Sequence, residues 1–394
     1  MGGPRNPGHA ERMNRAGTET AFEVFAMAKE IEKKGEKVIH FEMGEPDFDT
    51  PENIKEAAKK ALEAGYTHYT PAPGILELRQ AIAEYVSEDF GVDIDPEREV
   101  IVMPGAKPGI FTGILATVNP GDEVIMPNPA FPIYESVVNL VGAKPVPIPL
   151  REENDFRLSP EDVRRKVTKK TKMLILNTPH NPCGSTLMKS EVEELAEIAK
   201  EHNLWVMSDE IYSKIIYGGK HYSMLSVPGM KERTILIHGF SKTYAMTGWR
   251  LGYSIGNQEV IANMIKLQIN ISSCAAAFTQ IAAIEALRGP QDFVSRMVKE
   301  YERRRDTIVQ ALNSIKGFSC KTPTGAFYAF PNIEKTGMKS RDLMLKLLNK
   351  AHVACVHGTA FGEYGEGHLR FSYATSIENI KEGMERVKAT VEEL

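Results

Sequence analysis

The sequence predicts an α/β protein with a mostly parallel sheet, and the pattern of its apolar segments carries this prediction. Short apolar runs without polar alternation, which are typical of strands covered on both faces, lie at residues 99–103, 122–126, 172–176, 204–208 and 234–238. Helical patterns separate these runs, at residues 107–118, 131–142 and 190–203. Alternating strands and helices indicate a parallel sheet with helices on its faces.

The pattern changes near residue 292, which indicates a second, smaller domain of the α+β class. A long charged helix comes first, and apolar segments and further helices follow it. We expect a flexible leader at 1–18, because this stretch is rich in Gly and Pro. We expect an N-terminal arm at 19–50 that forms part of the small domain, a large domain at 51–291 and a C-terminal small domain at 292–394.

Composition excludes several classes of protein. The chain has 394 residues, of which 42% are hydrophobic and 25% charged, and its net charge of −4 offers no basic field for nucleic acid. No apolar stretch is long enough to span a membrane, and the first residues lack the apolar core of a secretory signal. The four cysteines form no C-x-x-C pair, which predicts reduced thiols in a cytoplasmic protein. We predict no metal site and no nucleic-acid or membrane partner.

Polar residues follow the predicted strands at the ends where parallel sheets place their sites. A small-residue turn at 104–109 enters a helix, where free backbone N–H groups favour a phosphate. Asn181 lies in a proline-rich loop, Asp209 ends a buried strand, and Lys242 follows another. Each has an ordinary explanation as a turn, a loop, a helix cap or a surface lysine. All four at strand ends of one sheet indicate a site, in which a desolvated lysine can attack a carbonyl.

The chain resembles the class I/II aminotransferases, which are pyridoxal 5′-phosphate (PLP) enzymes of fold type I, and in particular their aspartate aminotransferase subgroup. The resemblance runs from about Thr18 to the C-terminus. It rests on "GFSKTYAMTGWRLG" (239–252), "GEPDFDTP" (44–51), "NPCG" (181–184), "SDEIY" (208–212) and "RFSYA" (370–374). It implies a large PLP-binding domain with a seven-stranded sheet sandwiched by helices.

The resemblance implies a role for each polar residue that follows a strand. Lys242 is expected to form a Schiff base with the cofactor aldehyde and then to carry a proton. Arg250 is expected to bind the cofactor phosphate, and Asp209 to keep the pyridine nitrogen protonated. Asn181 and Tyr212 are expected to hydrogen-bond the phenolic oxygen of the ring.

Further cofactor contacts follow from the same resemblance. Gly105, Ala106 and Lys107 match the turn that cradles the phosphate, and Phe131 matches an aromatic residue that stacks on the ring, although a core role fits Phe131 equally well. Tyr69 matches a tyrosine that reaches the phosphate of the neighbouring subunit, which implies a homodimer.

One position of the lysine motif departs from the family pattern. The family often has a serine three residues before the lysine, where this chain has Gly239. Ser241 is the candidate to replace that serine as a phosphate ligand.

The resemblance also implies how substrates bind. Arg370 matches the arginine that grips the substrate α-carboxylate, and Gly44 and Asn181 lie beside that position. Lys107 matches a lysine that meets a distal carboxylate, which favours aspartate and glutamate with 2-oxoglutarate in ping-pong turnover. Phe22 or Phe25 near the pocket would instead favour aromatic or other neutral amino acids, unless both belong to the core face of a helix.

Two other functions remain open on the sequence. A PLP lyase of the same fold would share the cofactor-binding residues, and release of pyruvate from a cysteine conjugate would reveal it. A non-catalytic sensor module would need an attached DNA-binding domain, but only about 18 residues precede the matched region.

Overall fold

A seven-stranded sheet organises the larger part of the molecule. The computed structural model describes residues 8–393. Its largest sheet has the strand order β2-β8-β7-β6-β5-β3-β4, and β8 is the strand that runs antiparallel to its neighbours. The remaining pairs are parallel, so the predicted mostly parallel α/β sheet is confirmed.

The elements follow the order expected from the sequence. The strands of the large sheet are β2 (Val100–Met103), β3 (Glu123–Asn128), β4 (Lys144–Pro149), β5 (Thr171–Asn177), β6 (Trp205–Asp209), β7 (Thr234–Gly239) and β8 (Gly252–Ile255). The helices that pack around it are α2 (Glu52–Glu63), α3 (Leu76–Phe90), α4 (Lys107–Thr117), α5 (Ile133–Leu140), α6 (Pro160–Lys166), α7 (Lys189–Glu201), α8 (Gln258–Ile271) and α9 (Ala277–Arg288).

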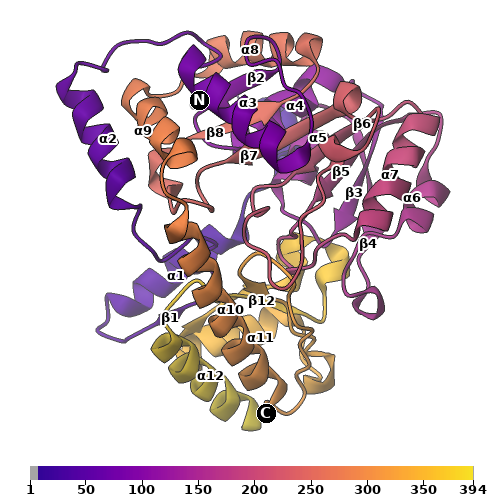
Figure 1. Ribbon diagram of the computed structural model, residues 1–394. Helices are drawn as coiled ribbons and strands as arrows, with labels where there is room; N and C mark the ends of the chain where they lie inside the picture. Colours follow the sequence, from indigo (N-terminus) through magenta and orange to yellow (C-terminus); the bar gives the residue numbers. More distant parts are fainter. Residues whose placement is uncertain (1–7, 394) are drawn as a thin grey trace, which may run out of the picture.

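Helices cover both faces of the large sheet (Figure 1). In β5, Leu174 and Leu176 pack into a core shared with α6 and α7. Met173 and Ile175 point to the other face, into a core shared with α4, α5 and α8. Because successive side chains of a strand alternate between faces, a strand buried on both sides must be apolar throughout, as the sequence of β5 is.

The edge strand β4 and the antiparallel strand β8 were not predicted from apolar runs. The sequence of β4 is KPVPIP, and proline is tolerated there because β4 lies at the sheet edge, where one side of the strand needs no ladder partner. In β8, Gly252 lies opposite Gly239 of β7. A Cβ on Gly239 would lie 2.9 Å from the Cα of Gly252, so a side chain at position 239 would require the two strands to shift.

The C-terminal part forms a separate layer below the large sheet (Figure 1). Its elements are α10 (Asp292–Asn313), β9 (Tyr328–Ala329), α11 (Ser340–Lys346), β10 (Val353–Ala354), β11 (Val356–His357), β12 (Leu369–Ser372) and α12 (Ile377–Glu392). The strands β11, β12 and β9 form a small sheet.

The N-terminal arm adds α1 (Thr20–Glu32) and β1 (Ile39–His40), and β1 pairs in parallel with β10. The arm therefore packs with the C-terminal elements. Part of the expected leader lies outside the described residues, and Glu11–Arg15 forms a short 3-10 helix.

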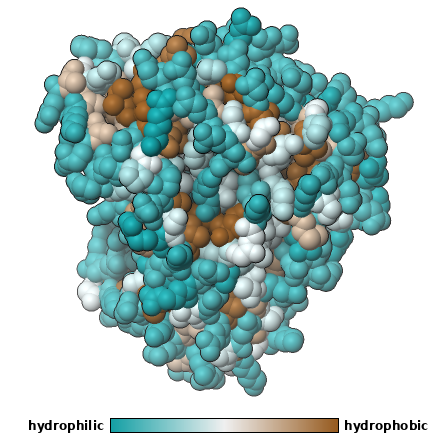
Figure 2. All heavy atoms as spheres, in the orientation of Figure 1, coloured by the Kyte–Doolittle hydropathy of each residue, from teal (hydrophilic) through white to brown (hydrophobic). Residues whose placement is uncertain are grey.

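Polar and charged side chains cover most of the face shown in Figure 2, and among the hydrophobic patches that interrupt them one lies between the upper and lower parts. Within residues 8–393, no helix is long and apolar enough to cross a membrane. The four cysteines, all within this range, are unpaired.

Candidate active site

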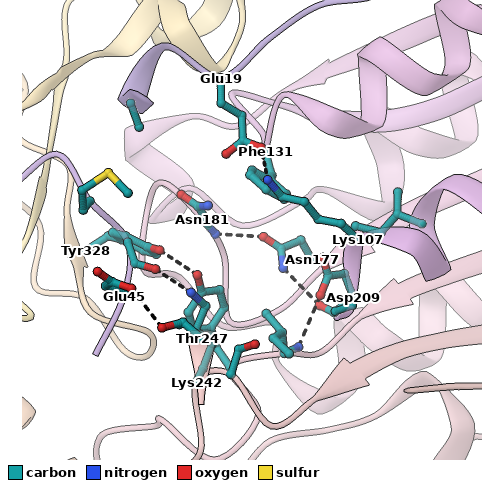
Figure 3. Close-up of a pocket in the computed structure, with 18 of the residues that line it drawn as sticks. Glu19, Glu45, Lys107, Phe131, Asn177, Asn181, Asp209, Lys242, Thr247 and Tyr328 are labelled. Atoms are coloured by element: carbon teal, nitrogen blue, oxygen red, sulfur yellow. Dashed lines mark hydrogen bonds and ion pairs between the residues drawn. The ribbon is translucent and has the colours of Figure 1, made fainter. Parts of the chain in front are cut away.

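A cavity of about 520 Å³ lies at the carboxyl ends of the parallel strands (Figure 3). It brings together residues from the large sheet, the N-terminal arm and the C-terminal part. The predicted residues that line it are Gly44, Ala106, Lys107, Phe131, Asn181, Asp209, Tyr212, Ser241, Lys242, Arg250 and Arg370. The polar residues that follow the strands in sequence therefore lie together around one cavity.

The carboxylate of Asp209 is buried at the end of β6. Its Oδ2 accepts a hydrogen bond of 2.6 Å from the hydroxyl of Tyr134, and its Oδ1 accepts one of 3.3 Å from the backbone N–H of Ile211. Burial raises the pKa of the Asp209 carboxyl to about 6, although the bond from Tyr134 opposes the shift. A carboxylate in such a place is stabilised by a cationic partner, and the cavity provides room for one.

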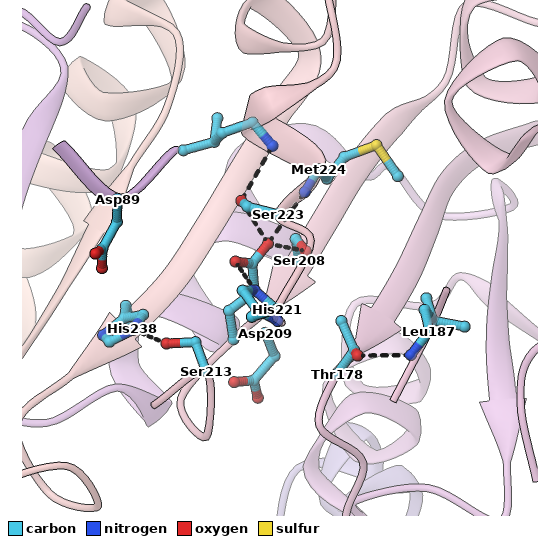
Figure 4. Close-up of polar contacts among 12 residues, drawn as sticks. Asp89, Thr178, Leu187, Ser208, Asp209, Ser213, His221, Ser223, Met224 and His238 are labelled. Atoms are coloured by element: carbon cyan, nitrogen blue, oxygen red, sulfur yellow. Dashed lines mark hydrogen bonds and ion pairs between the residues drawn. The ribbon is translucent and has the colours of Figure 1, made fainter. Parts of the chain in front are cut away.

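The neighbouring Glu210 is not part of the cavity lining, and its carboxylate interacts with a polar cluster of Ser208, Ser223 and His221, which are labelled in Figure 4. Ser208 and Ser223 donate hydrogen bonds of 2.7 and 2.9 Å to its Oε1, and His221 pairs with its Oε2. Burial alone would raise the pKa of Glu210, but His221 and the two hydroxyl groups outweigh it and hold the pKa below its ordinary value. The charge of Glu210 is thus satisfied within the cluster.

Lys242 follows β7, and its ammonium group donates a hydrogen bond to the backbone carbonyl of Gly44. Burial, partly opposed by the carboxylate of Glu45, lowers the pKa of this amine to about 8. The nearby cations Lys107, Arg370 and Arg250 act in the same direction as burial. An amine with this pKa is a much better nucleophile near neutral pH than an ordinary lysine.

Arg250 and the turn before α4 form an anion-binding end of the cavity. Gly105 has a φ of +97°, and a Cβ on it would collide with the Nη2 atom of Arg250, so glycine allows the guanidinium to lie against the turn. Lys107 begins α4 with Pro108 in the first turn, and the first backbone N–H groups of a helix attract anions. The buried Ser241 also lines the cavity.

Arg370 lies on β12, in the C-terminal part, and is buried. Its Nη1 donates a hydrogen bond of 3.0 Å to Oδ1 of Asn181, and its Nη2 donates to the backbone carbonyl of Glu42. The Nε atom is buried without a hydrogen-bond partner among the described residues. A buried guanidinium with an unused donor is suited to bind a carboxylate.

The N-terminal arm closes another side of the cavity. Glu19, just before α1, forms an ion pair with Lys107, and the ammonium group of Lys107 lies 5.2 Å from the ring centre of Phe131. Phe22 is 54% exposed and lines the cavity, so it does not belong to a core face. Phe25 lies elsewhere, with its ring centre 5.9 Å from that of His40.

Tyr69 is the predicted site residue that lies apart from this cavity. It sits in the loop between α2 and α3 and is 89% exposed. A large aromatic side chain with this exposure is available for contact with a second copy of the chain.

Sequence reasoning missed several residues of the site. Tyr134 lies on α5, and its ring centre is 5.9 Å from that of Phe131, which precedes the helix. Asn177, the last residue of β5, donates from Nδ2 to the backbone carbonyl of Asp209 at 3.1 Å and accepts from the N–H of Asn181 at 2.9 Å. Tyr328 of β9 shares a hydrogen bond of 2.6 Å with the hydroxyl of Tyr212. No local pattern distinguishes Tyr328 or Glu19.

The polar groups that line the cavity match the chemical groups of PLP. Arg250, Ser241 and the start of α4 suit its phosphate, the buried Asp209 suits a protonated pyridine nitrogen, and the amine of Lys242 suits its aldehyde. The fold and the site together define a PLP-dependent enzyme of fold type I.

Comparison with known proteins gives the family. Residues 36–387 match the family model of aminotransferase class I and II. An aspartate aminotransferase of Pyrococcus abyssi is 47% identical over 90% of this chain and 92% of its own length. An aromatic-amino-acid aminotransferase 2 of Thermococcus litoralis is 43% identical over 98% of both chains. The chain belongs to the class I and II aminotransferases, and it is a PLP-dependent enzyme.

A solved structure shows the same fold. The aspartate aminotransferase of Thermus thermophilus with maleate superimposes with a TM-score of 0.94 at 37% identity, over 98% of this chain and 100% of that one.

The lowered pKa of Lys242 leads to a direct prediction. In the PLP-free protein, trace acetylation of Lys242 should rise with pH around a midpoint near 8, because the neutral amine is the reactive form. Peptide mass spectrometry at a series of pH values measures this midpoint. A Lys242 midpoint near the ordinary lysine value of about 10.4 would contradict the assigned environment.

Proposed function

We propose that this aminotransferase moves an amino group between an L-amino acid and a 2-oxo acid by a ping-pong mechanism centred on Lys242. The observation that carries the proposal is that Lys242, Asp209 and Arg370 line one cavity. They supply a reactive amine, a buried carboxylate and a buried guanidinium. These are the groups needed to hold a cofactor aldehyde, to stabilise a ring cation and to bind an α-carboxylate.

The bound PLP supplies an electron sink for the pair left when a proton leaves the substrate Cα. The residues of the chain provide the setting for that chemistry. Asp209, held by Tyr134, keeps a cation at the ring nitrogen, and Arg250 with the start of α4 anchors the phosphate. Arg370, oriented by its bond to Asn181, fixes the substrate carboxylate.

Lys242 has two roles in this proposal. Its amine would hold the aldehyde of bound PLP, and the same amine, when free, would accept the proton of the substrate Cα and return it to the reacting group. Its pKa of about 8, lowered by burial, leaves a neutral fraction available near neutral pH, and its hydrogen bond to the carbonyl of Gly44 orients the amine in the cavity. Ordered replacement of one substrate by the next gives ping-pong kinetics.

For the substrate, we propose aspartate and glutamate with 2-oxoglutarate. Lys107 provides a cation in the cavity for a distal carboxylate. The names of the aspartate aminotransferases of Pyrococcus abyssi and Thermus thermophilus support this choice.

An aromatic amino acid is the alternative substrate. Phe22 and Phe131 both lie near Lys107, with ring centres 5.9 and 5.2 Å from its ammonium group. The Thermococcus litoralis relative is named for aromatic amino acids.

Absorbance spectra test the proposed reaction. The PLP-loaded protein, mixed with a single amino acid and no oxo acid, should convert its cofactor band from the aldehyde to the amine form, and Lys242→Ala should not do so at a comparable rate. A panel of amino acids ranks the donors. Stoichiometric pyruvate release from a cysteine conjugate without band conversion would point to a lyase.

Lys107→Ala tests the acidic-substrate assignment. We expect a loss of about tenfold in kcat/KM for aspartate and a much smaller loss for phenylalanine, because only aspartate has a second carboxylate for the ammonium group to bind. Steady-state kinetics with both donors at saturating 2-oxoglutarate measures the ratio. Equal losses would remove Lys107 from the specificity role.

We also propose a cytoplasmic homodimer in which Tyr69 completes the phosphate site of the partner. Tyr69→Phe should weaken PLP binding about tenfold, since a hydrogen bond to a charged group is lost. A purified hybrid of Tyr69→Phe and Lys242→Ala chains should regain one site of wild-type PLP affinity, because that site combines Lys242 from one chain with Tyr69 from the other. PLP titration of the hybrid decides the question. If Tyr69 acts within its own chain, no such site forms.

A further inference from the structure

Lys107, which we propose binds the distal carboxylate of an acidic substrate, already forms an ion pair with a carboxylate of its own chain. Glu19 reaches from the start of α1 to the ammonium group of Lys107, beside Phe131 (Figure 3). Both residues line the cavity. An acidic substrate that binds Lys107 must therefore compete with Glu19.

Glu19 is placed for this contact rather than for capping its own helix. It occupies the N-cap position of α1, but its side chain makes no capping hydrogen bond within the described helix. Buried Val24 and Ala28 anchor α1 against the C-terminal core. The packed helix thus holds Glu19 at the cavity.

The surroundings of the pair suit two kinds of substrate. With the pair intact, Lys107 is neutralised, and Phe22 and Phe131 leave an apolar border near it. With Glu19 turned away, the same ammonium group is available to a carboxylate. The side chain of Glu19 is 23% exposed and that of Lys107 is 41% exposed, so water can solvate Glu19 once it is displaced.

We propose that Glu19 is a specificity-determining residue that acts as an exchangeable counter-ion of Lys107. A dicarboxylic substrate replaces Glu19 on Lys107, whereas a neutral or aromatic substrate leaves the ion pair in place. This inference rests on the proposed function for its substrates. It places both substrate classes in one pocket, in which Glu19 weakens the binding of dicarboxylic substrates.

Calorimetric titration of the PLP-loaded protein with two unreactive probes tests the proposal. Succinate carries a second carboxylate, and 3-phenylpropionate carries an aromatic ring in its place. In Glu19→Gln, succinate should bind about fivefold more tightly, in line with loss of a partly exposed competing ion pair. Binding of 3-phenylpropionate should change less than twofold.

Two further variants distinguish replacement of Glu19 on Lys107 from a general change in the electrostatic potential of the cavity. Glu23→Gln removes the same charge from an exposed position of α1 outside the cavity lining, and it should leave both affinities unchanged. In a Lys107→Met background, Glu19→Gln should no longer tighten succinate binding, because the contested cation is absent.

The outcomes are decisive. Weaker or unchanged succinate binding in Glu19→Gln, equal tightening of both probes, or tightening that persists without Lys107 would each overturn the proposal. The test does not depend on turnover. If the wild-type protein transfers no amino group but the probes respond as expected, the proposed function fails and the counter-ion exchange stands. If amino-group transfer occurs and the probes do not respond as expected, the counter-ion exchange fails and the proposed function stands.

Discussion

The buried carboxylate of Asp209 is the constraint on which the site depends. It ends β6, the middle strand of the large sheet, and burial raises its pKa to about 6 even with the hydroxyl of Tyr134 bound to it. Such a group is costly to keep charged without a cation. The fold accepts this cost in a cavity that can admit a cationic ring, while Glu210, one residue further, has its charge satisfied by the polar cluster behind the turn.

The sheet explains why the other groups gather around Asp209. Parallel strands bring their carboxyl ends to one edge, so Asn177 of β5, Asp209 of β6 and the residues after β7 meet there although they are far apart in sequence. The apolar strands behind them are packed on both faces, which makes that edge rigid. The arm and the C-terminal part then complete the cavity lining, with Gly44 and Arg370.

The sequence was sufficient for the central strands and for the polar residues that follow them, because both follow from local patterns. Asp209 and Lys242 stand directly after apolar runs, and such positions have a defined place in a parallel sheet. The edge strand β4 was not predicted, since its three prolines argue against a strand unless its edge position is known. Glu19 was not predicted because its contact with Lys107 spans 88 positions of the chain. No periodicity encodes a contact of that kind.

The charges of the pocket show why such a long-range contact matters for the chemistry. Lys107, Arg370 and Arg250 all lower the pKa of Lys242, so a carboxylate that neutralises Lys107 also affects the amine that must accept a proton. In the resting pocket Glu19 supplies that neutralisation, and in the proposed exchange a dicarboxylic substrate supplies it instead. The charge around Lys242 is then similar whichever substrate class is bound. Under the proposed mechanism, Lys242 can therefore serve both halves of the reaction when the two substrates differ in charge.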